Sequence, residues 1–470
     1  MKTLLAIVLI SAGIACKSSK QTVIIPREDS TPITPIGDGF LTTADGSRLL
    51  TPFSAKVNAS SDFSSIQVDP TQTFQTIDGF GYTLTGGSVE LINTLSATKK
   101  TALLNDIFSK DGIGVSYIRI SVAASDLDGT VYTYSDLPAG QTDPEMKLFD
   151  LGPKGRELVA MLQEILIINP DLKIMASPWT APLWMKSNNN SKGGILLPKY
   201  HDAYAKYLVK YLQTMQDNSI HIDALTIQNE PEHGGNNPSM LMTPEQQAAF
   251  IKEALGPQMK IAGIDTKIII WDHNCDKPSY PITVLNDADA AQYITGSAFH
   301  LYAGDISALS AVKSAHPSKK LYFTEQWTGS NGDFAGDLMW HVKNVVIGSM
   351  RNHSQTALEW NLANDPTFGP HTPGGCTQCK GAVTITADSY TKNVSYYIIA
   401  QASKLIPPGS TRIYSNESGG VANVAFRLPN GQIGLVLLNE NQTTKTVKIS
   451  LPTQEVFLQL PARSVYSEVF

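Results

Sequence analysis

The chain of 470 residues is long enough for one large domain with a smaller one attached, or for three domains of ordinary size. Hydrophobic residues make up 42% of it and charged residues 17%, a globular composition that excludes a disordered chain or a long coiled coil. The formal charge of -6, without a long basic run, argues against nucleic acid as a partner and permits a neutral substrate.

Residues 1–16 have the pattern of an export signal. Lys2 precedes an apolar run from Leu4 to Ile10 that is too short to span a bilayer, and small residues then lead to Cys16. This pattern resembles a bacterial lipoprotein signal, in which Cys16 becomes the lipidated first residue; an ordinary cleaved signal peptide is the alternative. We therefore expect an exported protein, held at the outer membrane by its lipid alone, in the periplasm or at the cell surface.

The next two segments are predicted to connect this signal to the folded part. Residues 17–53 are rich in Ser, Thr, Pro and Asp and show little periodicity, which indicates a flexible tether. Residues 54–70 are expected to form strands that join a β-domain built from the other end of the chain.

Between residues 71 and 406, strand-like runs alternate with helical ones, which predicts an α/β domain. A doubly wound sheet is the alternative, but no glycine-rich phosphate loop follows the first strand. Eight strand–helix units match a (β/α)8 TIM barrel. The predicted strands are 76–81, 117–121, 173–177, 224–228, 267–272, 296–300, 321–325 and 357–360.

One of the intervening helices, 244–255, has clear boundary signals. Thr243 and Gln246 form a capping box, with Pro244 in the first turn. The dipeptide Gly256-Pro257 is expected to end this helix.

In such a barrel, the carboxyl ends of all strands open onto one face, where active sites lie. Glu230 and Glu325 each follow an apolar run directly, so both are expected at this face. Facing carboxylates are what glycoside hydrolysis needs, one as proton donor and one as nucleophile or base. For either glutamate alone, a structural bridge to a barrel arginine is the alternative. The predicted strand ends are polar or aromatic throughout: Arg119, Trp179, Asn229, Glu230, Asp272, His300, Glu325 and Trp360.

Residues 407–470 read as short alternating runs, with a hairpin signal at Asn430-Gly431. They predict a small antiparallel β-sandwich, completed by the strands at 54–70. The expected C-terminal strands are 421–426, 432–438, 444–449, 455–460 and 464–470.

Three cysteines remain after the leader. Cys376 and Cys379 are three residues apart, and Cys275 stands alone. Two thiols without a second pair make a zinc site improbable, so we expect no metal and no cofactor. A loop-closing disulfide between Cys376 and Cys379 fits an oxidising compartment, with a redox role as the alternative.

Several motifs, in their order and spacing, resemble glycoside hydrolase family 30, which includes lysosomal glucocerebrosidase. The resemblance runs from about residue 74 to the C-terminus. It rests on Asp78-Gly79-Phe80-Gly81, Gly112-Ile113-Gly114, Ile118-Arg119, Ser177-Pro178-Trp179-Thr180, Asn229-Glu230-Pro231, His300-Leu301-Tyr302, Thr324-Glu325 and Trp360-Asn361-Leu362.

The resemblance implies a retaining mechanism, with Glu230 as acid/base and Glu325 as nucleophile. The two carboxylates should then lie about 5–5.5 Å apart. We expect burial and the charge of Glu325 to raise the pKa of Glu230, and Arg119 to keep Glu325 ionised. Asn229 is expected to bind the 2-hydroxyl of the sugar.

Five further residues are expected around the sugar. Asp126 matches a family position that bonds glucose hydroxyls, with an ordinary loop aspartate as the alternative. Trp179 and Trp360 are predicted to wall the sugar site, with burial in the core as the alternative. His300 and Tyr302 are expected to line the site or to support the nucleophile; a packed histidine is the alternative.

The expected substrate is a β-glucan or a β-glucoside. The segment 81–88 lacks the acidic residue that glucocerebrosidase-like members carry, and the Gly-Gly-Cys-x-x-Cys loop is also unlike theirs. The chain instead resembles the exported bacterial branch that includes endo-β-1,6-glucanases, so we predict an endo-β-1,6-glucanase. We expect the protein to be a monomer. The alternatives are a glucosylceramidase or β-glucosidase, a xylanase, and a carbohydrate-binding lipoprotein without turnover.

Overall fold

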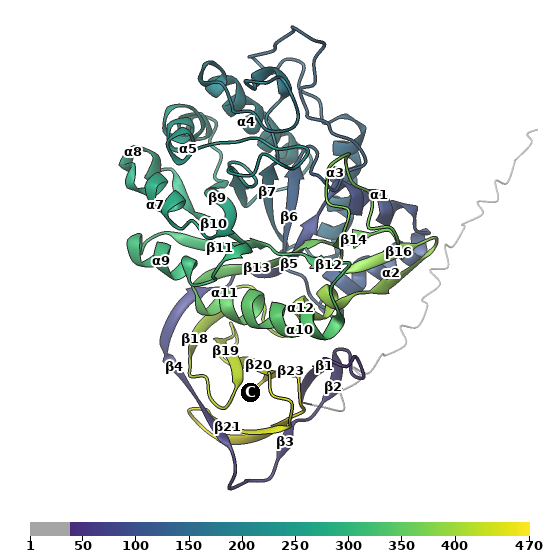
Figure 1. Ribbon diagram of the computed structural model, residues 1–470, viewed down its shortest axis with the longest axis vertical. Coiled ribbons are helices and arrows are strands. Elements are labelled where there is room, and N and C mark those ends of the chain that lie inside the picture. The colour runs from purple at the N-terminus through teal and green to yellow at the C-terminus, as the bar shows by residue number, and fades with distance from the viewer. Residues whose placement is uncertain (1–37) are drawn as a thin grey trace, which may run out of the picture. The chain divides into compact units, whose positions relative to one another are not determined.

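The computed structural model describes residues 38–470 (Figure 1), and the predicted signal, Cys16 and residues 17–37 of the predicted tether lie outside the described residues. Eight parallel strands close into a barrel, which confirms the predicted TIM fold. Each corresponds to one predicted strand. They are β5 (Gly79–Leu84), β6 (Tyr117–Val122), β7 (Lys173–Pro178), β8 (Ala224–Thr226), β9 (Lys267–Cys275), β10 (Ile294–Gly304), β11 (Lys320–Glu325) and β13 (Ser354–Asn361).

Helices between the strands cover the outside of the barrel (Figure 1). Among the described residues, no helix is both long enough and apolar enough to cross a membrane. The helices are α1 (Gly86–Thr94), α2 (Ala97–Phe108), α3 (Gly152–Ile168), α4 (His201–Asp217), α5 (Pro244–Phe250), α6 (Gly256–Ile261), α7 (Ser279–Asn286), α8 (Ala288–Ala291), α9 (Ala308–Ala315), α10 (Phe334–His341), α11 (Ser349–Arg351) and α12 (Val394–Ser403).

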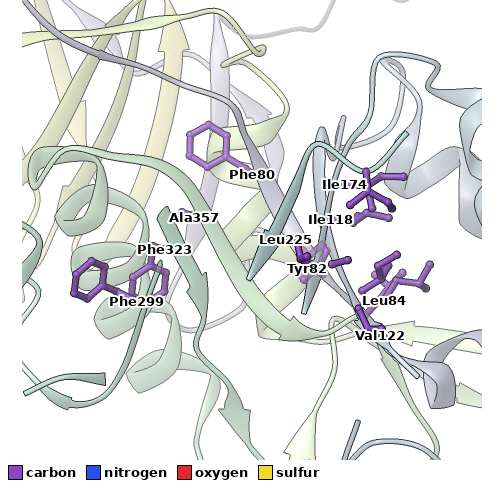
Figure 2. Packing of buried hydrophobic residues seen from close by; sticks show 14 of the residues in the cluster. Phe80, Tyr82, Leu84, Ile118, Val122, Ile174, Leu225, Phe299, Phe323 and Ala357 are labelled. Carbon is purple, nitrogen blue, oxygen red and sulfur yellow. The ribbon is translucent and has the colours of Figure 1, made fainter. Parts of the chain in front are cut away.

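The barrel strands are buried on both faces. One cluster takes a single residue from each of seven strands and therefore fills the barrel interior: Tyr117, Met175, Ala224, Ile269, Ala298, Tyr322 and Leu358. The alternate residues face the helices, as Ile118 and its strand partner Ile174 do in Figure 2. Since side chains two apart on a strand share a face, Arg119 and Thr324 lie one layer above Tyr117 and Tyr322 inside the barrel.

The helix predicted at 244–255 differs from expectation at its end. Its start is confirmed, because Thr243 N–H donates to Gln246 Oε1 at 2.9 Å and Thr243 Oγ1 accepts from Gln246 N–H at 3.3 Å. Gly256-Pro257 does not end it; the chain passes through a π-helical turn, Ile251–Leu255, straight into α6. The wider turn accommodates a proline that has no N–H to donate to the preceding turn.

A second sheet system forms a β-sandwich around its own apolar cluster. The predicted strands of 54–70 are present, and the long strand β4 pairs with both β18 and β21 before the chain enters the barrel. The sandwich consists of β1 (Gly39–Thr43), β2 (Thr51–Phe53), β3 (Lys56–Val57), β4 (Ser64–Thr76), β18 (Thr411–Ser415), β19 (Val421–Arg427), β20 (Ile433–Asn439), β21 (Lys445–Ser450), β22 (Glu455–Leu460) and β23 (Ser464–Val469).

The predicted tether at 17–53 is wrong at its C-terminal end. Strand β1 lies inside that range and pairs antiparallel with β23, from Gly39 opposite Glu468 to Thr43 opposite Ser464. Leu41 is fully buried in the sandwich core. The polar composition concealed this strand, because its stability comes from tertiary pairing and not from local pattern.

Short strands among the loops at the carboxyl ends complete the described structure. β12 (Thr328–Gly329) follows β11 and pairs with β15 (Cys379–Lys380). A second group consists of β14 (Ala363–Asn364), β16 (Val383–Thr386) and β17 (Ser389–Lys392).

We predict that Leu41→Ala destabilises the protein by about 2–5 kcal/mol, because it leaves a cavity in the sandwich core. Leu49→Ala is the matched control, since Leu49 is 40% exposed. The urea dependence of unfolding measures both. Equal stability of the two variants would mean that β1 is not part of the folded domain.

Candidate active site

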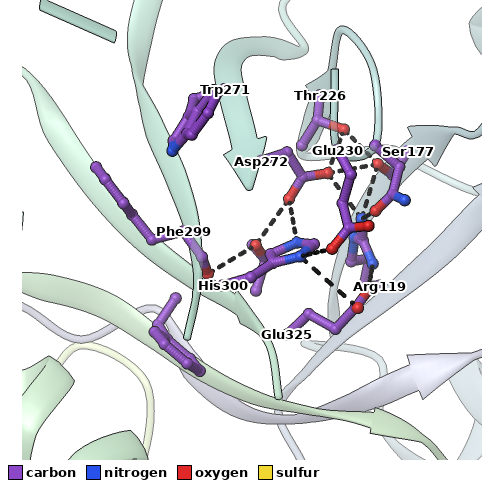
Figure 3. Close-up of polar contacts among 12 residues, drawn as sticks. Arg119, Ser177, Thr226, Glu230, Trp271, Asp272, Phe299, His300 and Glu325 are labelled. Atoms are coloured by element: carbon purple, nitrogen blue, oxygen red, sulfur yellow. Dashed lines mark hydrogen bonds and ion pairs between the residues drawn. The ribbon is translucent and has the colours of Figure 1, made fainter. Parts of the chain in front are cut away.

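The centre of the barrel mouth is organised by Arg119, whose side chain is completely buried. One guanidinium nitrogen, Nη1, donates to Glu325 Oε2 at 2.5 Å (Figure 3). The other, Nη2, donates to Asn229 Oδ1 at 2.6 Å, to Asp272 Oδ2 at 2.7 Å and to Ser177 Oγ at 3.1 Å. A single cation therefore ties together side chains from five barrel strands or strand ends.

Asp272 is the principal anionic partner of that cation. Its carboxylate also accepts hydrogen bonds from Thr226 Oγ1 at 2.8 Å, Thr324 Oγ1 at 2.7 Å and a ring nitrogen of His300 at 3.3 Å. Burial opposes ionisation, but the charge of Arg119 and these donors hold the pKa of Asp272 well below its usual range. Asp272 is therefore a permanent anion of the site.

Glu230 and Glu325 meet across the same cavity. A carboxylate oxygen of each, together with a ring nitrogen of His300, lie within 4.8 Å of one another. Glu325 is the last residue of β11, and Glu230 follows β8 with a φ of 46°, its N–H bonded to the carbonyl of Asp272 at 3.0 Å. Tyr302 Oη donates to Glu325 Oε1 at 2.9 Å. This proximity agrees with the strand-end prediction and with the short carboxylate separation of retaining glycosidases.

His300 lies behind the two glutamates and is fully buried. Of the two roles predicted for it, support of the carboxylates fits the structure, and it does not line the cavity. Its Nδ1 lies 3.1 Å from Glu230 Oε1 and 3.7 Å from Glu325 Oε1. Burial opposes the charged ring, but Glu325, Asp272 and Glu230 together raise the pKa of His300 to about 9. At neutral pH the ring is an imidazolium held among three carboxylates (Figure 3).

This imidazolium changes the expected pKa of Glu230. The sequence predicted that burial and the charge of Glu325 raise it. Burial does act in that direction, but the hydrogen bond and charge of His300 outweigh it and lower the pKa of Glu230. For Glu325, burial prevails over the charges of His300 and Arg119, and its pKa is raised. His300 therefore holds a proton beside both glutamates.

Glu230, His300 and Glu325 are also, among residues 38–470, a group whose ligand atoms lie close enough together for a metal ion. A protonated imidazole has no free lone pair to coordinate one. At neutral pH the trio is therefore better suited to sharing protons than to binding a cation.

A cavity of about 320 Å³ opens above these groups. Seven of the residues predicted to act in catalysis or sugar binding line it: Asp126, Trp179, Asn229, Glu230, Tyr302, Glu325 and Trp360. Other lining residues had been assigned no role from the sequence: His233, Asn236, His273, Asn274 and Trp327.

The two predicted tryptophans form one wall and are also part of the core. Their rings stack with centroids 5.5 Å apart, and the guanidinium of Arg119 lies 4.7 Å from the centroid of Trp179. Trp179 is only 1% exposed, and its Nε1–H has no partner among the described residues. An indole donor left unpaired at a cavity wall is suited to a ligand oxygen.

The Cys376–Cys379 disulfide is present, as predicted, and both cysteines line the cavity. The backbone N–H of Cys376 donates to Asp126 Oδ2 at 3.2 Å, and Cys379 packs in a cluster with Trp179 and Trp360. Burial, together with the negative charge of Glu325, raises the pKa of Asp126 to about 7. The disulfide loop thus fixes the aspartate that the resemblance assigned to sugar binding.

Comparison with known proteins agrees with this geometry. Residues 77–406 match the family described as "Glycosyl hydrolase family 30 TIM-barrel domain", and residues 409–467 match its beta sandwich domain. The chain belongs to glycoside hydrolase family 30.

Relatives in family 30 are similar over most of their length. The chain is 38% identical over 392 residues to "Endo-1,6-beta-D-glucanase neg1" of Aspergillus fumigatus, covering 78% of each chain. It is 30% identical over 413 residues to "Lysosomal acid glucosylceramidase" of Mus musculus, covering 82% of this chain and 79% of that one. The solved structure "The endo-beta1,6-glucanase BT3312" superimposes with a TM-score of 0.87 at 35% identity, covering 92% of this chain and 98% of that one.

Asp272 was visible in the sequence as a polar strand end but carried no assigned role. A signal for its role was present. A guanidinium at the position of Arg119 faces the interior of a closed barrel, where a charge must be paired. An aspartate ending another barrel strand is a natural partner. His273 and Asn274 lie beyond the predicted end of their strand, and no pattern in the sequence marked them.

We predict that the stability of the wild type falls relative to His300→Gln as pH rises. The pKa of His300 is about 9 when folded, against an ordinary value of 6.5. The contribution of the charged His300 ring to the stability of the folded protein is therefore fully present below about pH 6.5, and it is lost as the pH rises through about 9. At 1.36 kcal/mol per pKa unit, the wild type should lose up to about 3 kcal/mol of stability relative to His300→Gln over this pH range.

Urea unfolding between about pH 6 and 10 measures this difference. His221→Gln is the control, because His221 is an exposed histidine preceding β8. If the wild type and His300→Gln lose stability in parallel, His300 does not carry the buried charge.

Proposed function

We propose that this protein is a retaining endo-β-1,6-glucanase. The observation that carries the proposal is the pair of buried carboxylates, Glu230 and Glu325, facing one cavity with oxygens within 4.8 Å. Membership of family 30 supports the same chemistry. We assign Glu325 as nucleophile and Glu230 as acid/base.

In the first step, Glu325 attacks the anomeric carbon of a glucose unit as the bond to the leaving oxygen breaks. Arg119 and Tyr302 hold one oxygen each of the attacking carboxylate, which fixes its direction. Glu230 protonates the leaving oxygen with a proton that it receives from the His300 imidazolium through their hydrogen bond, which leaves the His300 ring neutral. The products are a free chain end and a covalent glucosyl ester on Glu325.

In the second step, Glu230 accepts a proton from water and returns it to His300, and the water oxygen attacks the same carbon from the vacated face. The ester bond breaks and returns the electron pair to Glu325. Loss of the charge on Glu325 in the intermediate removes a group that raises the pKa of both His300 and Asp126. The two inversions together retain the β-configuration.

The choice of β-1,6-glucan is supported by the relatives. Besides the Aspergillus protein and the solved structure, "Endo-1,6-beta-D-glucanase" of Neurospora crassa is 34% identical over 90% of this chain. A glucosylceramidase or β-glucosidase is the second candidate, because relatives named as glucosylceramidases are 28–32% identical. Solved xylanases in the family are below 25% identity and indicate the fold alone.

We also propose that the mature enzyme is an exported, monomeric lipoprotein anchored through Cys16. The leader pattern supports export, and a disulfide beside the cavity suits an oxidising compartment. The site needs no second chain, because both carboxylates and their partners come from one. The mass of the mature N-terminal peptide tests the anchor: a diacylglyceryl adduct on Cys16 is expected, and an unmodified cysteine would contradict it.

We predict that Glu325→Gln lowers kcat/KM on β-1,6-glucan by about 10⁴-fold or more, because no covalent intermediate forms. Glu230→Gln should cost about 10²–10⁴-fold on the glucan. It should form the intermediate almost normally from a dinitrophenyl β-glucoside, whose leaving group needs no proton.

Product release from β-1,6-glucan, β-1,3-glucan, xylan and an aryl β-glucoside measures these changes and the specificity together. Glu232→Gln is the control, since Glu232 lies two residues from Glu230 and pairs with Lys277 at the surface. Activity on the aryl glucoside alone would reject the endo-glucanase assignment, and full activity of Glu325→Gln would reject the nucleophile.

A further inference from the structure

Two strands, β9 and β10, extend past the layer of side chains that holds Arg119, Asp272 and Glu325, on one side of the barrel mouth. β9 has nine residues and β10 has eleven, whereas β6, β7 and β11 have six each. The sequence predicted that they end at Asp272 and His300, but pairing continues beyond these residues, up to Gly304 opposite Cys275. We call residues 273–275 and 301–304 the β9–β10 extension.

At the start of the extension, the backbone conformation directs two consecutive side chains toward the cavity. Trp271 and Asp272 have φ values of 71° and 63°, a conformation that non-glycine residues adopt only where the surroundings enforce it. The strand register shifts at the same place, between Ala298 and Phe299 of the neighbouring strand. As a result, the consecutive residues His273 and Asn274 both line the cavity.

The two side chains have hydrogen-bonding capacity that the protein leaves unused. His273 is 8% exposed, and its Nδ1 has no partner among the described residues. Its ring packs against Trp271 with centroids 4.9 Å apart. Asn274 Oδ1 accepts from the N–H of Tyr302 at 3.0 Å, which fixes the amide and leaves its NH₂ group free of any partner in residues 38–470.

The extension lies on the side of the acid/base. Glu230 N–H donates to the carbonyl of Asp272, the residue directly before His273, at 3.0 Å. Asp126, held by the disulfide loop, follows β6, which lies three strands from β9 in the barrel order. Because Glu230 protonates the leaving oxygen, the space beside it receives the part of the substrate that departs.

The chemistry of this wall is polar and uncharged. Burial lowers the pKa of His273 to about 4, so its ring is uncharged at neutral pH. His233 and Asn236, from the loop after Glu230, add further polar groups to the cavity. Such a wall matches the hydroxyls of a second sugar ring, whereas an acyl chain would bury these groups unpaired.

We propose that the β9–β10 extension, through His273 and Asn274, is the subsite that binds the glucose unit on the leaving side of the scissile bond. It selects a sugar as leaving group and disfavours a lipid. The inference rests on the proposed function in one respect, the assignment of Glu230 as acid/base.

The test uses His273→Phe, which keeps the ring against Trp271 and removes both nitrogens, and His273→Gln, which restores a hydrogen-bonding group. His221→Phe is the matched control at an exposed histidine. Activity is measured on a β-1,6-linked glucotriose and on dinitrophenyl β-glucoside. With the aryl glucoside as donor and β-linked glucobioses as acceptors, the ratio of transfer to hydrolysis reports the subsite after the intermediate has formed.

For His273→Phe we expect kcat/KM on the trisaccharide to fall about tenfold more than on the aryl glucoside, which corresponds to the loss of one or two hydrogen bonds. The transfer ratio should fall by a similar factor, His273→Gln should recover part of both, and His221→Phe should match the wild type. Equal losses on both substrates with an unchanged transfer ratio would overturn the inference, because they indicate a purely structural role.

The outcome also separates this inference from the proposed function. If the wild type does not cleave β-1,6-glucan, the proposed substrate is wrong, but the transfer ratio with β-1,3- and β-1,4-linked acceptors still tests the subsite. Preferential transfer to octanol over any glucobiose would overturn it in favour of an apolar leaving group.

Discussion

The ion pair between Arg119 and Asp272 is the interaction on which the rest of the site depends. Both side chains are completely buried inside a closed barrel, where an unpaired charge would be very costly. Pairing alone would not suffice, and the Asp272 carboxylate also accepts hydrogen bonds from the hydroxyl groups of Ser177, Thr226 and Thr324. The two groups therefore fix where five strand ends meet. Glu325 and Asn229 take their positions from the same guanidinium.

The strain in the backbone supports this arrangement. Glu230, Trp271 and Asp272 all have positive φ values, and they are joined by the bond from Glu230 N–H to the carbonyl of Asp272. Left-handed conformations at non-glycine residues cost about 1–3 kcal/mol each and persist where surrounding contacts enforce them. Here they place the Glu230 carboxylate beside His300. The same turn begins the extension that we propose as the leaving-side subsite, so the proposed acid/base and the proposed subsite share one structural origin.

Much of the fold could be predicted from sequence, because strand and helix periods are local properties. All eight barrel strands and the convergence of Glu230 with Glu325 followed from that pattern. The predictions that failed concern features that depend on tertiary contacts. β1 is stable only through pairing with β23, and the helix at 244–255 crosses Pro257 through a π-turn that no local signal marks. The lowered pKa of Glu230 depends on His300 lying 3.1 Å away, a distance that strand assignment does not provide.

The central claim is that Glu325 is the carboxylate that bonds to the sugar. Dinitrophenyl 2-deoxy-2-fluoro-β-glucoside tests it most directly, because the fluorine slows breakdown of the glycosyl-enzyme and lets it accumulate. Peptide mass spectrometry of the inactivated enzyme should show one sugar, esterified to the peptide that contains Glu325. A sugar on any other residue, or an enzyme that turns over glucan through no trappable ester, would contradict the account.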